Sequence, residues 1–139
     1  PLSEKRKPTT PYSAKFSVPF CIATGLFFGK AGLVEFTEKQ IKDHDILNLC
    51  SKISYEIDPE NEYPKNYSGD IKITIDNSQV IQEKQPGLRG GRLFPLDEKE
   101  VEEKFLDNLK FGNLNSSEIN NVKKFFETFF KDPDFSLLN

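Results

Sequence analysis

Apolar and polar positions divide the chain into segments, and the most apolar segment runs from Tyr12 to Gly29 with very few charges. Ser17 can cap a helix, Pro19 suits its first turn and Gly29 suits its end, so the pattern predicts a helix over about residues 18–28. Apolar residues lie most of the way round this helix, which is typical of a helix enclosed on several sides. They are Phe20, Ile22, Ala23, Leu26, Phe27 and Phe28.

Two further patterns follow this helix. Thr37 and Gln40 match the capping box that begins a short helix, and apolar residues spaced by three and four over 46–53 predict another helix packed along one side. The spacing of apolar residues then changes to two, which predicts a half-buried strand. The alternating residues of this strand are Ile53, Tyr55 and Ile57.

The clearest β-hairpin lies between residues 71 and 81. Isoleucines alternate with polar residues over 71–75, Asp76-Asn77-Ser78 supplies a turn, and Val80 and Ile81 carry the return strand. The aperiodic segment before the hairpin is predicted to be a loop, which Tyr63 and Tyr67 could hold against the body of the protein.

The pattern becomes helical again near the C-terminal end. Asp97 and Glu100 form a variant of the capping box and Gly112 is a typical end, so a helix is predicted between them. A last helix is predicted from Ser117, and its phenylalanines make a wide apolar face suited to a thick local core or to docking on another domain or subunit. These residues are Phe125, Phe126, Phe129 and Phe130.

The predicted fold class is α+β, a two-layer sandwich in which a small antiparallel sheet of about three strands packs with helices. The length of 139 residues suits one domain. We expect a linker-like arm over residues 1–11, an α/β domain over 12–112, and a C-terminal helix over 113–139 that docks on a helical domain missing from the chain. The chain contains no Met and starts in a loop-like segment, which suggests a piece of a longer protein.

Composition and charge argue against several classes of function. A net charge of −3 gives no broad basic field, so nucleic acid is not an expected partner. Lys5, Arg6 and Lys7 form a short basic cluster that we interpret as a solvated face. No segment is long and apolar enough to span a membrane. Cys21 and Cys50 lack the spacing of a metal site, and we interpret them as reduced core residues of a cytoplasmic protein in preference to the alternative of a disulfide.

Residues 85–96 (QPGLRGGRLFPL) are the segment best suited to contact a ligand, with three Gly, two Pro and two Arg. The guanidinium groups of Arg89 and Arg92 can present forked donors to a carboxylate or phosphate, and Gly90 permits close approach of the backbone. On composition alone, a mobile surface loop with solvated arginines is the more common explanation.

No catalytic constellation is visible, and we predict no metal site. The single histidine, His44, lies between Asp43 and Asp45 at the polar start of a helix, where a solvated side chain is much more common than a base or a ligand. Nothing matches a Walker loop, a Rossmann fingerprint or a nucleophile elbow.

Several segments together resemble the C-terminal part of the MmgE/PrpD family, which includes 2-methylcitrate dehydratase, cis-aconitate decarboxylase and iminodisuccinate epimerase. The resemblance runs from about Pro8 to Phe111 and rests on the order and spacing of its motifs. These are Pro8-Thr9, the segment AKFSVPF over 14–20, Ala23, Leu26, Gly29, Phe36-Thr37, the strand hairpin, Pro86-Gly87, Pro95-Leu96 and Glu102-Glu103-Lys104-Phe105.

The resemblance implies an enzyme that moves a proton alpha to a carboxylate of a small di- or tricarboxylic acid without a cofactor. It also implies that a helical N-terminal domain, absent here, supplies most catalytic residues, so the isolated chain is expected to be inactive and no catalytic residue is assigned within it. Homodimers are common in the family. The alternative is a non-catalytic interaction or anion-binding module with the same fold.

Two positions of the matched segments bear on the site. The position of Phe20 is often Tyr in the family, and a hydrogen-bonding or proton-transfer role cannot be carried over to Phe because it lacks the hydroxyl. The candidates for substrate binding are Arg89, Gly90, Arg92 and Ser17, with the arginines chosen for their carboxylate chemistry.

Overall fold

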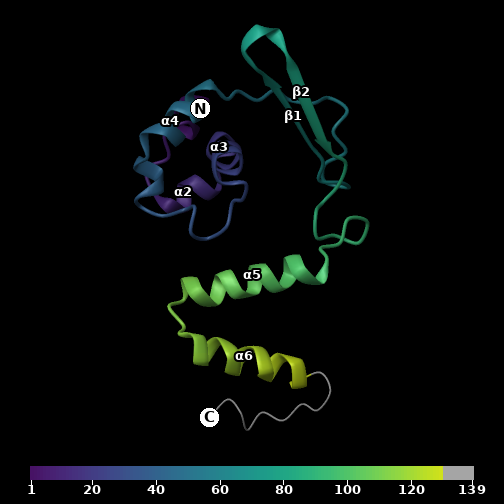
Figure 1. The fold of residues 1–139 in the computed structure, drawn as a ribbon. Helices are drawn as coiled ribbons and strands as arrows, with labels where there is room; N and C mark the ends of the chain where they lie inside the picture. The colour runs from purple at the N-terminus through teal and green to yellow at the C-terminus, as the bar shows by residue number, and fades with distance from the viewer. Residues whose placement is uncertain (130–139) are drawn as a thin grey trace. The chain divides into compact units, whose positions relative to one another are not determined.

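The computed structural model of the chain describes residues 1–129. The described residues are α+β, with helices and one two-stranded antiparallel sheet, which confirms the predicted class (Figure 1). They divide into two compact units: Pro1–Ser54 with the residues from Glu102 onward, and Tyr55–Val101. The elements are α1 (Leu2–Lys5), α2 (Pro11–Lys15), α3 (Val18–Phe28), η1 (Gln40–Lys42), α4 (His44–Lys52), β1 (Gly69–Thr74), η2 (Asp76–Ser78), β2 (Val80–Gln85), α5 (Glu98–Phe111) and α6 (Ser116–Phe129).

Helix α3 has the bounds that its capping residues predict. The Ser17 hydroxyl oxygen accepts a hydrogen bond from the Phe20 backbone N–H at 3.1 Å. At the other end Gly29 adopts a left-handed backbone with φ of 72°, and its N–H donates to the Gly25 carbonyl at 2.9 Å. Both ends of the helix are therefore satisfied by local groups, which is why the sequence reveals them.

A small apolar core lies between α3 and α4. Phe20 is fully buried and its ring lies 5.8 Å from that of Phe36. Asp43 caps α4 by accepting from the N–H groups of Asp45 and Ile46. Helix α4 packs against α3, and its buried residues are Ile46 and Cys50. The buried apolar residues of this core are Ala14, Phe20, Ala23, Ile41, Ile46 and Cys50.

The prediction that α3 is enclosed on several sides is wrong for the described residues. Leu26 is 50% exposed, Phe27 51% and Phe28 37%. The buried residues of α3 are Pro19, Phe20, Ala23 and Thr24, and Cys21 and Ile22 are half-buried. One side of α3 is thus buried in the core, and Leu26, Phe27 and Phe28 form an exposed apolar surface on the rest of the helix.

The N-terminal segment, predicted to be a linker-like arm, makes hydrogen bonds to later segments. It contains α1, and the Arg6 guanidinium donates to the Ile53 carbonyl at 2.8 and 2.6 Å. Lys5 Nζ donates to the Phe16 carbonyl at 2.8 Å. Lys5 and Lys7 are exposed, as the interpretation of the cluster as a solvated face requires, whereas Arg6 is half-buried against the Ile53 carbonyl, so the interpretation is wrong for Arg6. The division into arm, domain and terminal helix remains a prediction.

The predicted hairpin is confirmed. β1 and β2 pair antiparallel, with Ile73 opposite Ile81, and the Ile75 N–H donates to the Gln79 carbonyl at 2.8 Å next to the turn. The strand predicted from Ile53, Tyr55 and Ile57 does not form, so among the described residues the sheet has two strands and not three. Alternation predicts an extended segment, but a strand also needs a partner for its backbone groups, and none pairs with this one.

The last two described helices form a hairpin of their own (Figure 1). Asp97 Oδ1 accepts from the Glu100 N–H at 2.8 Å and Glu100 Oε2 accepts from the Asp97 N–H at 3.0 Å, which confirms the predicted capping box of α5. Phe105 of α5 lies against Phe126 of α6, with ring centroids 5.7 Å apart. Phe130 and the rest of the predicted C-terminal segment lie outside the described residues.

Candidate functional site

The Arg-Gly-Gly-Arg segment is a tight turn closed by its own backbone. The Gly90 N–H donates to the Phe94 carbonyl at 2.7 Å, the Gly91 N–H to the Leu88 carbonyl at 3.0 Å, and the Phe94 N–H to the Gly91 carbonyl at 3.2 Å. Gly90 has a φ of 87°, a conformation that residues with a Cβ rarely adopt. The turn is therefore fixed by hydrogen bonds and by glycine, although few side chains are buried around it.

Gly87 lets the two ends of this turn approach each other. A Cβ at this position would lie 2.7 Å from the Phe94 ring and 3.2 Å from Asn66 Oδ1. Gly87 is also buried, so an added methyl group has no space to occupy. The close packing of Phe94 on a bare backbone defines the shape of the adjacent pocket.

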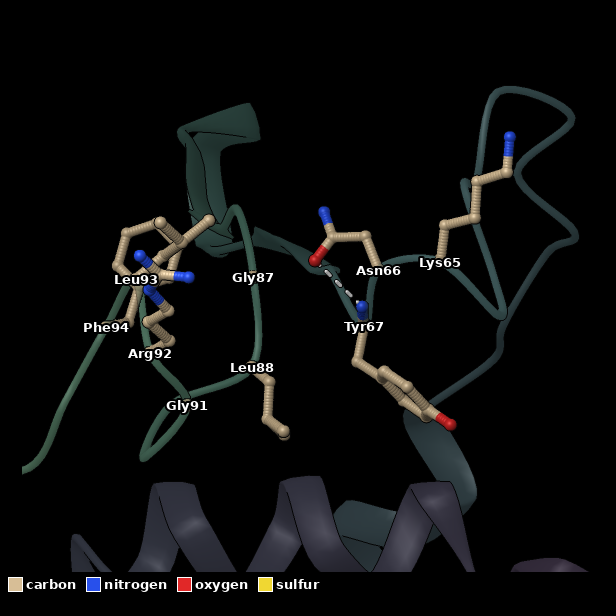
Figure 2. A pocket seen from close by; sticks show the side chains of 9 residues that line it. All are labelled: Lys65, Asn66, Tyr67, Gly87, Leu88, Gly91, Arg92, Leu93 and Phe94. Atoms are coloured by element: carbon tan, nitrogen blue, oxygen red, sulfur yellow. Dashed lines mark hydrogen bonds between the residues drawn. The ribbon is translucent and has the colours of Figure 1, made fainter.

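An open pocket of about 280 Å³ lies beside the turn (Figure 2). In Figure 2, Arg92, Leu93 and Phe94 lie on one side of it and Asn66 and Tyr67 on the other, with the Gly87 backbone between them. The charged residues of the lining are Arg92 and Lys65, and the lining includes no carboxylate. The lining residues are Lys65, Asn66, Tyr67, Gly87, Leu88, Gly91, Arg92, Leu93 and Phe94. This combination of cations and apolar surface suits a small anion that carries an apolar part.

Asn66 fixes the second wall of the pocket. Its Nδ2 donates to the Pro86 carbonyl at 2.8 Å and to Glu62 Oε2 at 3.2 Å, and its Oδ1 accepts from the Tyr67 N–H at 2.9 Å (Figure 2). These bonds attach the loop before β1 to the segment after β2. The sequence analysis did not identify this wall, although it noted Tyr67 as a residue that could anchor the loop.

The two arginines of the turn differ in their contacts. Arg89 forms an ion pair with Glu100, the residue whose other carboxylate oxygen caps α5. Arg92 makes no hydrogen bond or ion pair with any other residue in the described part of the chain. An unpaired guanidinium keeps its forked donors available to a ligand, whereas those of Arg89 are engaged by a carboxylate. The structure therefore separates two residues that the sequence treats alike.

The remaining candidates have structural contacts. Gly90 shapes the turn and does not line the pocket, whereas Gly91 does. Ser17 belongs to the other unit, where its hydroxyl is buried, donates to the Lys5 carbonyl and accepts from the Phe20 N–H. Both hydrogen-bonding functions of Ser17 are thus used within the fold. Phe20, the position that is often Tyr in the resembling family, is a core residue here.

Thiols and the histidine offer no further reactive group. Burial raises the pKa of the Cys50 thiol from 9.0 to about 11, and burial also raises the pKa of Cys21. Both are free cysteines. His44 begins α4 with an exposed side chain, which confirms the solvated interpretation. In the part of the chain that the structure describes, no three side chains of metal-ligating type are grouped to hold an ion.

None of the helices over residues 1–129 has the length and apolar character needed to cross a membrane.

Comparison with known proteins indicates the family of the chain. No curated protein matches the chain. The family model of the MmgE/PrpD C-terminal domain matches residues 2–126, which extends the resemblance beyond both ends of the motifs that first indicated it. The chain therefore belongs to the MmgE/PrpD C-terminal domain family.

Proposed function

We propose that this chain is the C-terminal domain of a cofactor-independent, dehydratase-like enzyme that acts on small di- or tricarboxylic acids. Its turn over residues 87–94 contributes a cationic wall to the carboxylate site. Membership of the MmgE/PrpD C-terminal domain family supports the enzyme class. Cys21 and Cys50 form no disulfide among the described residues, which suits the cytoplasmic location that we propose.

The observation that carries this proposal is the unpaired guanidinium of Arg92 beside an open pocket. A guanidinium matches a carboxylate in shape and donates two parallel hydrogen bonds to it. Leu93 and Phe94 next to it give the pocket an apolar surface that suits the carbon skeleton of the acid. Lys65 is the other charged residue of the lining, and its positive charge attracts an acid with two carboxylates more strongly than a monocarboxylate.

The chemistry of the lining residues suits binding more than proton transfer. The lining contains neither a carboxylate nor a histidine that could act as a general base near neutral pH. In this proposal the helical domain supplies the groups that remove the proton alpha to the carboxylate. The present chain orients the acid and has no turnover when it is alone.

A titration with citrate, 2-methylcitrate and cis-aconitate tests this proposal, with backbone NMR shifts as the readout and a turnover assay alongside. We expect shifts in residues 87–94 without turnover, and Arg92→Gln weakens binding by about tenfold because a charge-assisted pair is lost. Lys84→Gln removes an exposed lysine of β2 and is the matched control. Equal weakening by both variants, or no shifts at millimolar acid, would contradict the proposal.

The second candidate is a non-catalytic interaction module, which the exposed apolar residues of α3 favour. The two functions differ in what the intact protein does. Turnover of any of the three acids by the intact protein supports the enzyme. Absence of turnover, together with absence of acid-dependent shifts in the turn, supports the interaction module.

A further inference from the structure

Asn66 makes the hydrogen bond that joins the two walls of the pocket. Its Nδ2 donates to the Pro86 carbonyl at 2.8 Å, and among the described residues this is the hydrogen bond that crosses from the loop over 61–68 to the segment over 86–94. The two strands are paired only from the start of β1 to the end of β2, so strand pairing does not extend into the walls. The separation of the walls therefore depends on Asn66.

The side chains of Asn66 and Phe94 meet at Gly87. An added Cβ at Gly87 would lie 3.2 Å from Asn66 Oδ1 and 2.7 Å from the Phe94 ring, so both groups border the space that a side chain there would need. Phe94 belongs to the turn that carries Arg92, and its N–H and its carbonyl are both bonded within that turn. Asn66 is therefore coupled to the turn by close packing as well as by its hydrogen bond.

Asn66 is itself held by its own loop. Its Oδ1 accepts from the Tyr67 N–H at 2.9 Å, and its Nδ2 also donates to Glu62 Oε2 at 3.2 Å. The Lys65 N–H donates to the Glu62 carbonyl at 2.9 Å, so the same loop residue holds the backbone of Lys65 and the side chain of Asn66. The charged residues of the lining are Lys65 and Arg92, and they belong to the two segments that Asn66 joins.

We propose that Asn66 is a positioning residue of the carboxylate site, and that its bond to Pro86 determines which separation of two carboxylates the site accepts. This inference rests on the proposed function, because it takes Arg92 as the residue that binds an acid. A monocarboxylate needs one cation, whereas a dicarboxylate gains from Lys65 only when the segments that carry the two cations are held at a suitable distance. Without the bond these segments sample many separations, and binding must order them, which lowers the affinity.

NMR titrations of the whole chain with propionate, malonate, succinate, glutarate and adipate test this proposal. In the wild type the affinity for the four diacids should vary by at least about fivefold with their length. Asn66→Ala should weaken the preferred diacid by about tenfold and reduce the variation to within about twofold, while the affinity for propionate changes by less than about twofold. Asn61→Ala is the matched control, because the Asn61 side chain bonds Ser68 and the Tyr63 N–H within the same loop, and it should keep the wild-type pattern.

A double-mutant cycle with Lys65→Gln separates positioning from a general loss of structure. Lys65→Gln removes the second cation, so the diacids should lose their advantage over propionate. Adding Asn66→Ala to this variant should then weaken diacid binding by less than about twofold, because no second cation remains to be positioned. A pocket that loses its structure would instead lose diacid affinity by the same factor in both backgrounds.

The outcomes distinguish this inference from the function on which it rests. Equal weakening of propionate and the diacids by Asn66→Ala, a length dependence that this variant leaves unchanged, or equal losses in the two Lys65 backgrounds would overturn the positioning role alone. In each of these cases Arg92→Gln still weakens binding, and the proposed function stands. Absence of acid-dependent shifts in the wild type, or binding that Arg92→Gln leaves unchanged, would overturn both.

Discussion

Residues Pro1–Ser54 and Tyr55–Val101 fold by different means. The first region buries Phe20, Ile46 and other apolar side chains between α3 and α4. In the second, Gly87 is the buried residue among those described, and the hairpin and turn are held by backbone hydrogen bonds and glycine. Burial of apolar area stabilises the first region, whereas the second keeps charged and apolar groups exposed. The comparison indicates that apolar burial stabilises the first region, whereas backbone hydrogen bonds and glycine determine the shape of the second.

Removing the largest core side chain should have the largest effect on the first region. Phe20→Ala is expected to reduce the free energy of unfolding by about 3–5 kcal/mol, because a fully buried ring leaves a cavity. Chemical denaturation followed by circular dichroism measures this free energy of unfolding. Leu26→Ala, at a half-exposed position of the same helix, is the control and should cost much less. Equal losses would contradict the view that burial on one side of α3 stabilises this region.

Alkaline pH should weaken the first region through Cys50. Its pKa is raised from 9.0 to about 11 in the folded state, so the folded protein keeps the proton that the unfolded chain releases. The contribution is fully present below pH 9 and is lost as pH rises toward 11. The free energy of unfolding should fall by up to about 3 kcal/mol over this interval. The slope of the free energy of unfolding against pH should differ between wild type and Cys50→Ala, and this difference isolates the contribution of the thiol. Identical slopes would contradict the burial of Cys50.

Glycine should matter more than apolar burial in the second region. Gly87→Ala places a Cβ 2.7 Å from the Phe94 ring, so we expect a loss of about 2 kcal/mol of local stability. Hydrogen exchange of the Gly90 and Phe94 amides should accelerate while the amides of α3 keep their protection. Gly69→Ala is the matched control because no atom lies within 4 Å of the added group. Loss of protection in α3 as well would show that the two regions do not respond separately.

Local interactions explain what could be predicted from the sequence. Ser17 and Gly29 determine both ends of α3, Asp97 and Glu100 begin α5, and alternation with a turn produces the hairpin. Each of these interactions joins residues within a few positions of one another, so residue type and spacing are sufficient. The family resemblance likewise depended on motifs within short segments.

Contacts between distant residues were decided only by the tertiary structure. Arg89 and Arg92 are equivalent by composition, and the pairing of Arg89 with Glu100 leaves Arg92 as the available guanidinium. The bond from Asn66 to the Pro86 carbonyl builds a pocket wall that no local pattern indicates. The strand expected at 53–57 fails for the same reason, because alternation gives a segment its extended preference, whereas its hydrogen-bonding partner comes from elsewhere in the fold.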